Sequence, residues 1–132
     1  MGADDPRLGY DNRTCGFRVV GHGVSLRAET RIPGADANPY LAFAALLASG
    51  LHGIEQELEL GPAFEGNAYE SDVERFPPTL RDAIAALERG TTARRAFGDE
   101  VVDHYLNYAR TEQRLFDEVV TCYERERMFE RG

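Results

Sequence analysis

Three charged residues alternate along one short stretch of the sequence, Arg27, Glu29 and Arg31. Alternate residues of an extended strand lie on the same face, so we expect these three side chains to point to one side. Arg13 and Arg18, slightly earlier in the sequence, could join them. Guanidinium groups are always charged and bind phosphate or carboxylate oxygens in bidentate fashion. The cluster is therefore typical of a site for a polyanion such as a nucleotide triphosphate.

The single acid of this cluster, Glu29, cannot neutralise four arginines, which leaves room for an anionic ligand. The arginines should also lower the pKa of Glu29 and keep it ionised. An ionised carboxylate suits Mg²⁺, which usually takes one or two carboxylates together with substrate phosphates. The alternative is a solvated hairpin face on which Arg and Glu pair across the strands. The spacing alone favours this alternative and leaves both open.

Two strands must position the cluster. Residues 13–20 and 24–32 are rich in β-branched and aromatic residues, and the Gly-His-Gly sequence between them indicates a turn, so we predict a β-hairpin. Arg13 and Arg18 differ in parity along the first strand. They can share a face only if the strand bulges, and Gly16 is the expected position.

An apolar helix is predicted directly after the hairpin. Asn38 is a favourable N-cap, Pro39 suits the first helical position, and Gly50 is the expected end. Apolar residues cover most of the circumference of this helix, so we expect it to be buried on several sides. Because two further helices and a hairpin could not cover it, we expect the chain to pack against another polypeptide.

The remaining elements complete an α+β fold, a β-hairpin followed by three main helices and mostly helical. Thr79 should cap the second helix, and the last helix should run from about residue 99 to 129. Residues 61–78 are predicted to be a long loop and residues 1–11 a loop or ragged start. Residues 12–132 would form one domain.

Composition excludes several classes of function. A net charge of −8 argues against general nucleic-acid binding. None of the fifteen basic residues is lysine, which excludes a phosphate-loop or Schiff-base lysine. The two cysteines, Cys15 and Cys122, fit neither a metal site nor a disulfide framework. The longest apolar run is too short to cross a bilayer, and the first residues do not form a signal peptide, so we expect a cytoplasmic protein without a membrane partner.

The sequence DNRTCGFRVVGHGVSLRAETRIPGADANPYLAFAALLASGLHGIE resembles the C-terminal half of the glutamine synthetase catalytic domain. The family pattern has Asn-Arg, an Arg five positions later, an Arg-x-Glu-x-Arg strand, then Asn-Pro-Tyr-Leu and an alanine-rich helix. The resemblance continues through GNAYE, PPTLRDAI and YERERMFERG, and covers about residues 9–132. The sequences RIPGADANPYLAFAA and ERERMFER are most similar to the branch that joins glutamate to polyamines or other amines.

The resemblance implies an ATP-dependent ligase, usually oligomeric, that phosphorylates the glutamate side chain before ammonia or an amine attacks the γ-glutamyl phosphate. Arg13, Arg18 and Arg27 would contact the ATP phosphates, and Arg31 the glutamate. Glu29 would bind the Mg²⁺ or Mn²⁺ ion on the nucleotide phosphates. Arg13 and Arg31 would be the catalytic residues, acting on the transferring phosphoryl group and the phosphorylated intermediate.

Other parts of the family pattern do not occur in this sequence. These are the earlier metal-binding glutamates and histidine, the β-grasp domain, and the upstream glutamate- and nucleotide-binding segments. We therefore expect the isolated chain to be inactive, and to form homo-oligomers or associate with the missing part of the enzyme. One alternative is a non-catalytic nucleotide- or partner-binding module derived from the same enzyme. Another is a purely structural helical module whose Arg-Glu-Arg strand is a surface ladder.

Overall fold

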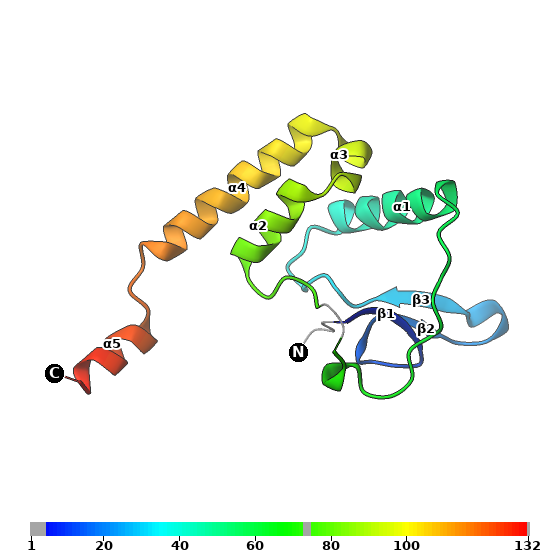
Figure 1. Cartoon of the computed structure of the whole chain (residues 1–132), viewed down its shortest axis with the longest axis horizontal. Helices are drawn as coiled ribbons and strands as arrows, with labels where there is room; N and C mark the ends of the chain where they lie inside the picture. Colours follow the sequence, from blue (N-terminus) through cyan, green and yellow to red (C-terminus); the bar gives the residue numbers. More distant parts are fainter. Residues whose placement is uncertain (1–4, 73–74, 132) are drawn as a thin grey trace. The chain divides into compact units, whose positions relative to one another are not determined.

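The predicted hairpin is present as the strands β2 (Cys15–Val20) and β3 (Arg27–Thr30), which pair in antiparallel fashion. The structure is a computed structural model that describes residues 5–72 and 75–131. It divides into two compact units, Met1–Phe76 and Pro77–Gly132. The first unit holds the sheet and the helix α1, and the second holds the other helices (Figure 1). This confirms the α+β, mostly helical fold.

A third strand lies where a loop was predicted. β1 (Asp5–Tyr10) pairs with β2 in parallel, giving the strand order β1-β2-β3. Partners such as Leu8 and Phe17 are nine positions apart, so the chain makes one short coil instead of a long crossover. The irregularity in this sheet lies in β1, between Asp5 and Leu8. The bulge predicted at Gly16 is therefore wrong, because β1 advances three residues from Asp5 to Leu8 while β2 advances two from Cys15 to Phe17, which puts the extra residue in β1.

The turn between β1 and β2 is held by the segment that was predicted to be a long loop. The Asn12 side chain donates to the Gly66 carbonyl at 2.9 Å, and Thr14 Oγ1 accepts from the Ala68 amide at 2.9 Å. The Phe64 amide donates to the Leu8 carbonyl at 2.8 Å. Within the described part of this segment, the short 3₁₀ helix η2 (Ala68–Glu70) is the regular element. Residues 73–74 of the predicted loop lie outside the described residues.

The helix α1 (Pro39–Glu55) begins as predicted but ends later. The Asn38 side chain accepts from the amides of Tyr40 and Leu41, and Pro39 is the first helical residue. Gly50 does not end the helix, because an interior glycine costs only about 1 kcal/mol relative to alanine and five more residues follow it in α1. The turn beyond the helix instead places Glu57 at a φ of +50°.

We expect the Asn38→Ala substitution to lower the free energy of unfolding by about 0.5–2 kcal/mol. The reason is that it leaves the amides of Tyr40 and Leu41, which now donate to Asn38 at 3.0 and 3.4 Å, without this acceptor. Urea denaturation followed by circular dichroism measures the change. Asn38→Ser is the matched control, because serine also caps helices. Equal losses in the two variants would contradict a capping role.

No side chain of α1 is fully buried, so the expected burial on several sides is wrong for this chain. The exposed apolar side chains include several large ones, with exposed fractions from 60 to 83%: Tyr40, Phe43, Leu47, Leu51 and Ile54. The alternation of alanine with large apolar residues is typical of a packed helix. Among the described residues of its own unit, no helix or strand packs extensively against α1.

We therefore expect the chain to self-associate at micromolar concentration in spite of its charge of −8, because exposed apolar patches of this kind drive association. Light scattering measures the mass in solution. Replacing both Phe43 and Leu47 by glutamate should shift the chain toward a monomer, whereas replacing the exposed Arg89 of unit 2 should not. A monomeric wild-type chain that binds no hydrophobic dye would contradict this prediction.

The second unit contains four helices, α2 (Leu80–Arg89), α3 (Thr92–Phe97), α4 (Asp99–Asp117) and α5 (Cys122–Phe129). Thr79 caps α2 as predicted, accepting from the Asp82 amide. α3 was not predicted. The predicted single last helix is wrong, because the chain breaks after α4 and Thr121 and Glu124 form a capping box that starts α5.

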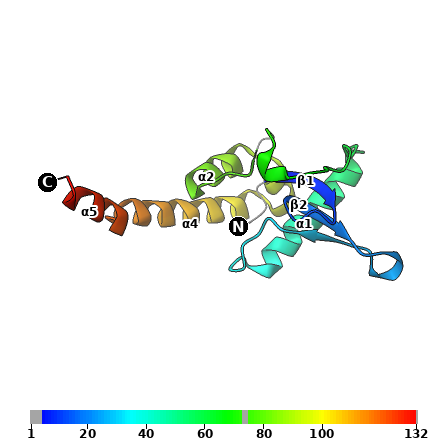
Figure 2. The same cartoon turned by 90° about the horizontal axis from the view of Figure 1, so that it is seen from below.

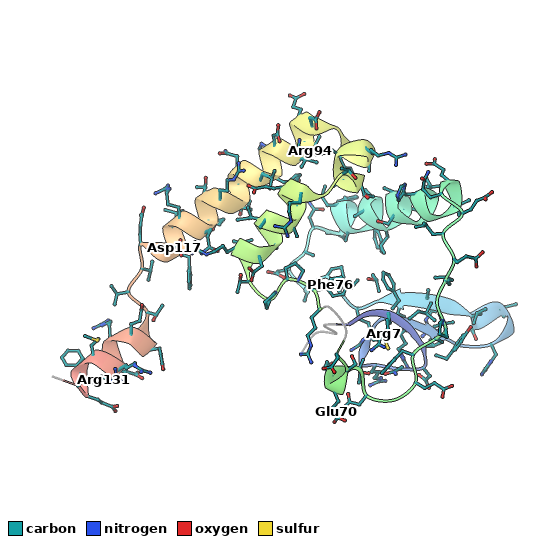
Figure 3. All side chains as sticks on the ribbon, in the orientation of Figure 1. Arg7, Glu70, Phe76, Arg94, Asp117 and Arg131 are labelled. Carbon is teal, nitrogen blue, oxygen red and sulfur yellow. The ribbon has the colours of Figure 1, made fainter. Side chains whose placement is uncertain are left out.

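Among the described residues of this unit, α4 packs against both α2 and α3. α2 lies beside α4, as Figures 1 and 2 both show. Val102 and Leu106 of α4 are its buried apolar residues. Asp117, labelled in Figure 3, accepts two hydrogen bonds at 2.9 Å from Arg81 of α2. Among the described residues, none of the helices has the length and apolar character needed to cross a bilayer.

Candidate functional site

The register of β2 and β3 brings the predicted charged residues together. Arg18 is the direct cross-strand partner of Glu29, and Val20 is the partner of Arg27. Direct partners in an antiparallel pair lie on the same face, so Arg18, Glu29 and Arg27 share one face of the hairpin. The Arg31 amide donates to the Gly16 carbonyl at 2.8 Å and continues the ladder past the end of β3.

Glu29 accepts a hydrogen bond on each carboxylate oxygen. Arg18 Nη1 donates to Oε2 at 2.9 Å, and Arg27 Nη2 donates to Oε1 at 3.0 Å. The Glu29 side chain is 29% exposed, and that of Arg18 only 15%. The hydrogen bond from Arg18 holds the pKa of Glu29 below its ordinary value, with further lowering from the charges of Arg18 and Arg27. The predicted lowering of this pKa is confirmed.

This lowered pKa makes stability depend on pH. The folded state favours the ionised carboxylate, so the stabilisation is fully present above the ordinary glutamate pKa of about 4.3. It is lost as the pH falls through the lower pKa of the folded state. We expect acid unfolding of Glu29→Gln to lack this contribution. Identical pH profiles for Glu29→Gln and wild type would contradict the coupling.

Arg18 has a second carboxylate partner that the sequence analysis missed. Its Nη2 donates to Oδ1 of Asp11, which lies in the turn between β1 and β2. The hydrogen bonds from Arg18 to Asp11 and Glu29 raise the pKa of Arg18. In the sequence, Asp11 is an ordinary polar turn residue beside the Asn-Arg pair. It becomes part of the cluster because the coil of β1 and β2 places this turn next to Arg18.

Arg13 lies in that turn and not on a strand, so the predicted strand position is wrong. It is exposed, and with Arg18 it lines an open pocket of about 660 Å³. The other lining residues are Tyr10, Asp11, Asn12, Ala63, Phe64, Glu65 and Gly66. Arg13 thus lines the same pocket as Arg18, and Arg27 binds the Glu29 carboxylate that Arg18 also binds.

A second, mostly apolar pocket of about 630 Å³ is also lined by Phe64, together with residues that include Leu8, Phe17, Leu60 and Pro62. Arg7, labelled in Figure 3, stacks on the Phe64 ring at 3.6 Å from the ring centre. Ala63, Phe64 and Glu65 line both pockets. The segment that carries Phe64 therefore borders both a charged pocket and an apolar one.

The residues of the site fit an anion better than a complete metal centre. The Nε atoms of Arg18 and Arg31 are buried and have no hydrogen-bond partner among the described residues, so unused donors remain. Such donors suit phosphate or carboxylate oxygens. Among the same residues, no three His, Cys, Asp or Glu side chains gather to hold a metal ion. Glu29 could supply one ligand, and others would have to come from elsewhere.

Comparison of the sequence with known protein families agrees with a site for phosphate or carboxylate groups. Residues 5–128 match the catalytic domain of glutamine synthetase. This chain belongs to the glutamine synthetase family. Among its relatives, a gamma-glutamylethanolamide synthetase of Streptomyces coelicolor is 59% identical over 123 residues, which are 93% of this chain and 27% of the relative. The family resemblance expected from the sequence is confirmed.

Other relatives in the glutamine synthetase family are more distant. A type-1 glutamine synthetase of Dictyostelium discoideum is 38% identical over 95% of this chain and 25% of its own length. A glutamate–isopropylamine ligase of a Pseudomonas species is 44% identical over 74% of this chain and 22% of its own length. The chain thus spans about a quarter of the length of the curated relatives that it matches.

Proposed function

We propose that this chain is the C-terminal portion of an ATP-dependent ligase that joins glutamate to ammonia or an amine through a γ-glutamyl phosphate. The observation that carries the proposal is the Arg18–Glu29 cluster, in which buried guanidinium donors remain unused, in a chain of the glutamine synthetase family. Carboxylate oxygen is a poor leaving group, so the reaction needs phosphorylation. Phosphorylation needs positive charge around the transferring group.

Each residue of the cluster has a role in this proposal. Arg18 and Arg27 bind ATP phosphate oxygens, and so does Arg13, which lines the same pocket as Arg18. Arg31 binds the carboxylate of glutamate or of the phosphorylated intermediate. Because the arginines cannot lose their protons, they contribute fixed charge and orientation and leave proton transfer to other groups.

Glu29 would supply one carboxylate ligand to a Mg²⁺ or Mn²⁺ ion. When bound, such an ion neutralises charge on phosphate oxygens and orients them. Its remaining ligands would be phosphate oxygens and groups outside the described residues, because these residues hold no cluster of three potential ligands. Arg18 and Arg27 keep Glu29 ionised and fix both of its oxygens.

The acceptor is proposed to be an amine larger than ammonia. This rests on the names of relatives, which include a gamma-glutamylethanolamide synthetase, a glutamate–isopropylamine ligase and a gamma-glutamylputrescine synthetase of Escherichia coli. The last is 36% identical over 86% of this chain. The exposed apolar face of α1 supports an assembly in which further polypeptide, from the same enzyme or from other subunits, covers that face.

A chimera tests this function. In the Streptomyces coelicolor relative, the matched segment is replaced by the corresponding 123 residues of this chain. We expect release of phosphate from ATP that requires glutamate, an amine and a divalent ion. Ammonia, ethanolamine, putrescine and isopropylamine are compared as acceptors. A folded chimera that cannot use any of them, beside an active parent enzyme, would contradict the proposal.

A second candidate is a non-catalytic module that binds nucleotide phosphates. It is favoured by one observation, namely that both Glu29 oxygens are already bound by arginines. In that case the isolated chain binds triphosphate without a divalent ion, and the chimera is inactive. Titration of the chain with inorganic triphosphate, with and without Mg²⁺, separates the two candidates.

A further inference from the structure

Asp11 holds Arg18 from the side opposite to Glu29. Arg18 Nη2 donates to Asp11 Oδ1, while Arg18 Nη1 donates to Glu29 Oε2. The two carboxylates come from different elements, the β1–β2 turn and β3. The Arg18 side chain between them is only 15% exposed, whereas that of Asp11 is 79% exposed. The guanidinium group is therefore anchored at two different nitrogens.

The position of Asp11 is itself fixed by the turn. Its amide donates to the Val19 carbonyl at 2.9 Å, and its φ of +48° lies in the left-handed region. Asp and Asn adopt that region more readily than most residues. The neighbouring Asn12 side chain donates to the Gly66 carbonyl at 2.9 Å and accepts from the Thr14 amide at 3.0 Å. The backbone at Asp11 is thus fixed by its own hydrogen bond to Val19 and by the hydrogen bond from the next residue, Asn12, to Gly66.

Two anchors at separate nitrogens set the plane of a guanidinium, whereas one anchor leaves it free to turn about that bond. With both anchors in place, Arg18 still has a second N–H on each Nη and the unpartnered Nε–H. Arg18, Asp11 and Arg13 line the same pocket. The direction of the remaining N–H groups therefore depends on Asp11 as well as on Glu29.

We propose that Asp11 is a positioning residue, which holds the Arg18 guanidinium in the orientation that binds phosphate oxygens. The proposal rests on the proposed function, because the phosphate-binding role of Arg18 belongs to it. Whether anion binding weakens or strengthens when Asp11 is replaced separates a positioning role from a purely electrostatic effect of its charge. Removing a carboxylate beside an anion site strengthens anion binding by Coulomb's law, but removing an anchor of Arg18 weakens it.

Titration of the full 132-residue chain with inorganic triphosphate tests the direction of this change. We expect affinity to fall from wild type to Asp11→Asn to Asp11→Ala, by roughly two- to fivefold in total, as suits a pair with one exposed partner. Asparagine keeps an oxygen acceptor and tolerates the left-handed backbone, so Asp11→Asn should fold even if Asp11→Ala does not. The control is Glu65→Gln, an acid of the same pocket, which should bind equally or more tightly. Unchanged or tighter binding in Asp11→Asn would overturn the proposal.

Nuclear magnetic resonance of the guanidinium nitrogens tests the anchoring without a ligand. The signals of Arg18 are identified by their loss in Arg18→Lys. We expect slow rotation of the Arg18 Nη groups in the wild type and faster rotation, by a severalfold factor, in Asp11→Asn. Unchanged rotation in the folded variant overturns the proposal whether or not triphosphate binds. If rotation speeds up but the wild-type chain binds no triphosphate, Asp11 does anchor Arg18 and the phosphate site of the proposed function fails.

Discussion

Glu29→Gln in the chimera is expected to lower turnover by about 100-fold or more and to raise the divalent-ion concentration needed for half-maximal rate. Glutamine is nearly isosteric, but it removes the charge that a metal ligand needs. Glu29 now accepts from Arg18 on one oxygen and from Arg27 on the other. In glutamine, an NH₂ group would replace one of these oxygens and would face the N–H donors of one of the two arginines. The hairpin should remain folded, because the loss of a cross-strand pair costs only about 0.2–1 kcal/mol.

A joint titration of Mg²⁺ and ATP on the purified variant measures both effects. Glu65→Gln is the control, since Glu65 is an exposed acid of the neighbouring pocket. If Glu29 is only a partner in a solvated ladder, stability falls slightly and kinetics do not change. Normal turnover with unchanged metal dependence would therefore remove Glu29 from the catalytic site.

The isolated 132-residue chain is expected to have no measurable ligase activity with glutamate and ammonia or any of the amines. The cluster has two carboxylates, Glu29 and Asp11, and Arg18 already binds both, so it cannot hold the metal ions of the reaction. The described residues hold no group of three potential ligands. Coupled phosphate release is measured with Mg²⁺ or Mn²⁺, and the chimera serves as the positive control. Turnover by the chain above a no-protein control would contradict this prediction.

Features with a local cause could be predicted from the sequence. Asn38 and Thr79 cap their helices because a short polar side chain there can accept from amides two or three residues on. The alternation of Arg27 and Glu29 needed only the period of a strand. The pairing of Glu29 with Arg18 followed from the hairpin register, which a single turn determines.

Features that depend on a parallel pairing of strands only nine or ten positions apart were missed, because parallel strands ordinarily need a longer connection. β1 contains Pro6 and charged residues, and it is a strand because β2 provides a parallel partner. The contact of Asp11 with Arg18 depends on the same coil, so nothing in the residues around Asp11 points to it. The break before α5 is different. Thr121 and Glu124 have the spacing of a capping box, and this signal could have divided the long predicted helix.

The short coil of β1 and β2 has a consequence for folding kinetics. The paired residues of the sheet are seven to thirteen positions apart, from Val20 with Arg27 to Phe17 with Thr30. Loops of about ten residues close in roughly 10–100 ns, and local contacts make folding fast. Both partners of Arg18 lie within eleven positions of it. The strand pairing that brings these charged residues together therefore needs only residues 5–31, and the contacts of residues 64–68 that hold the β1–β2 turn are added later in synthesis.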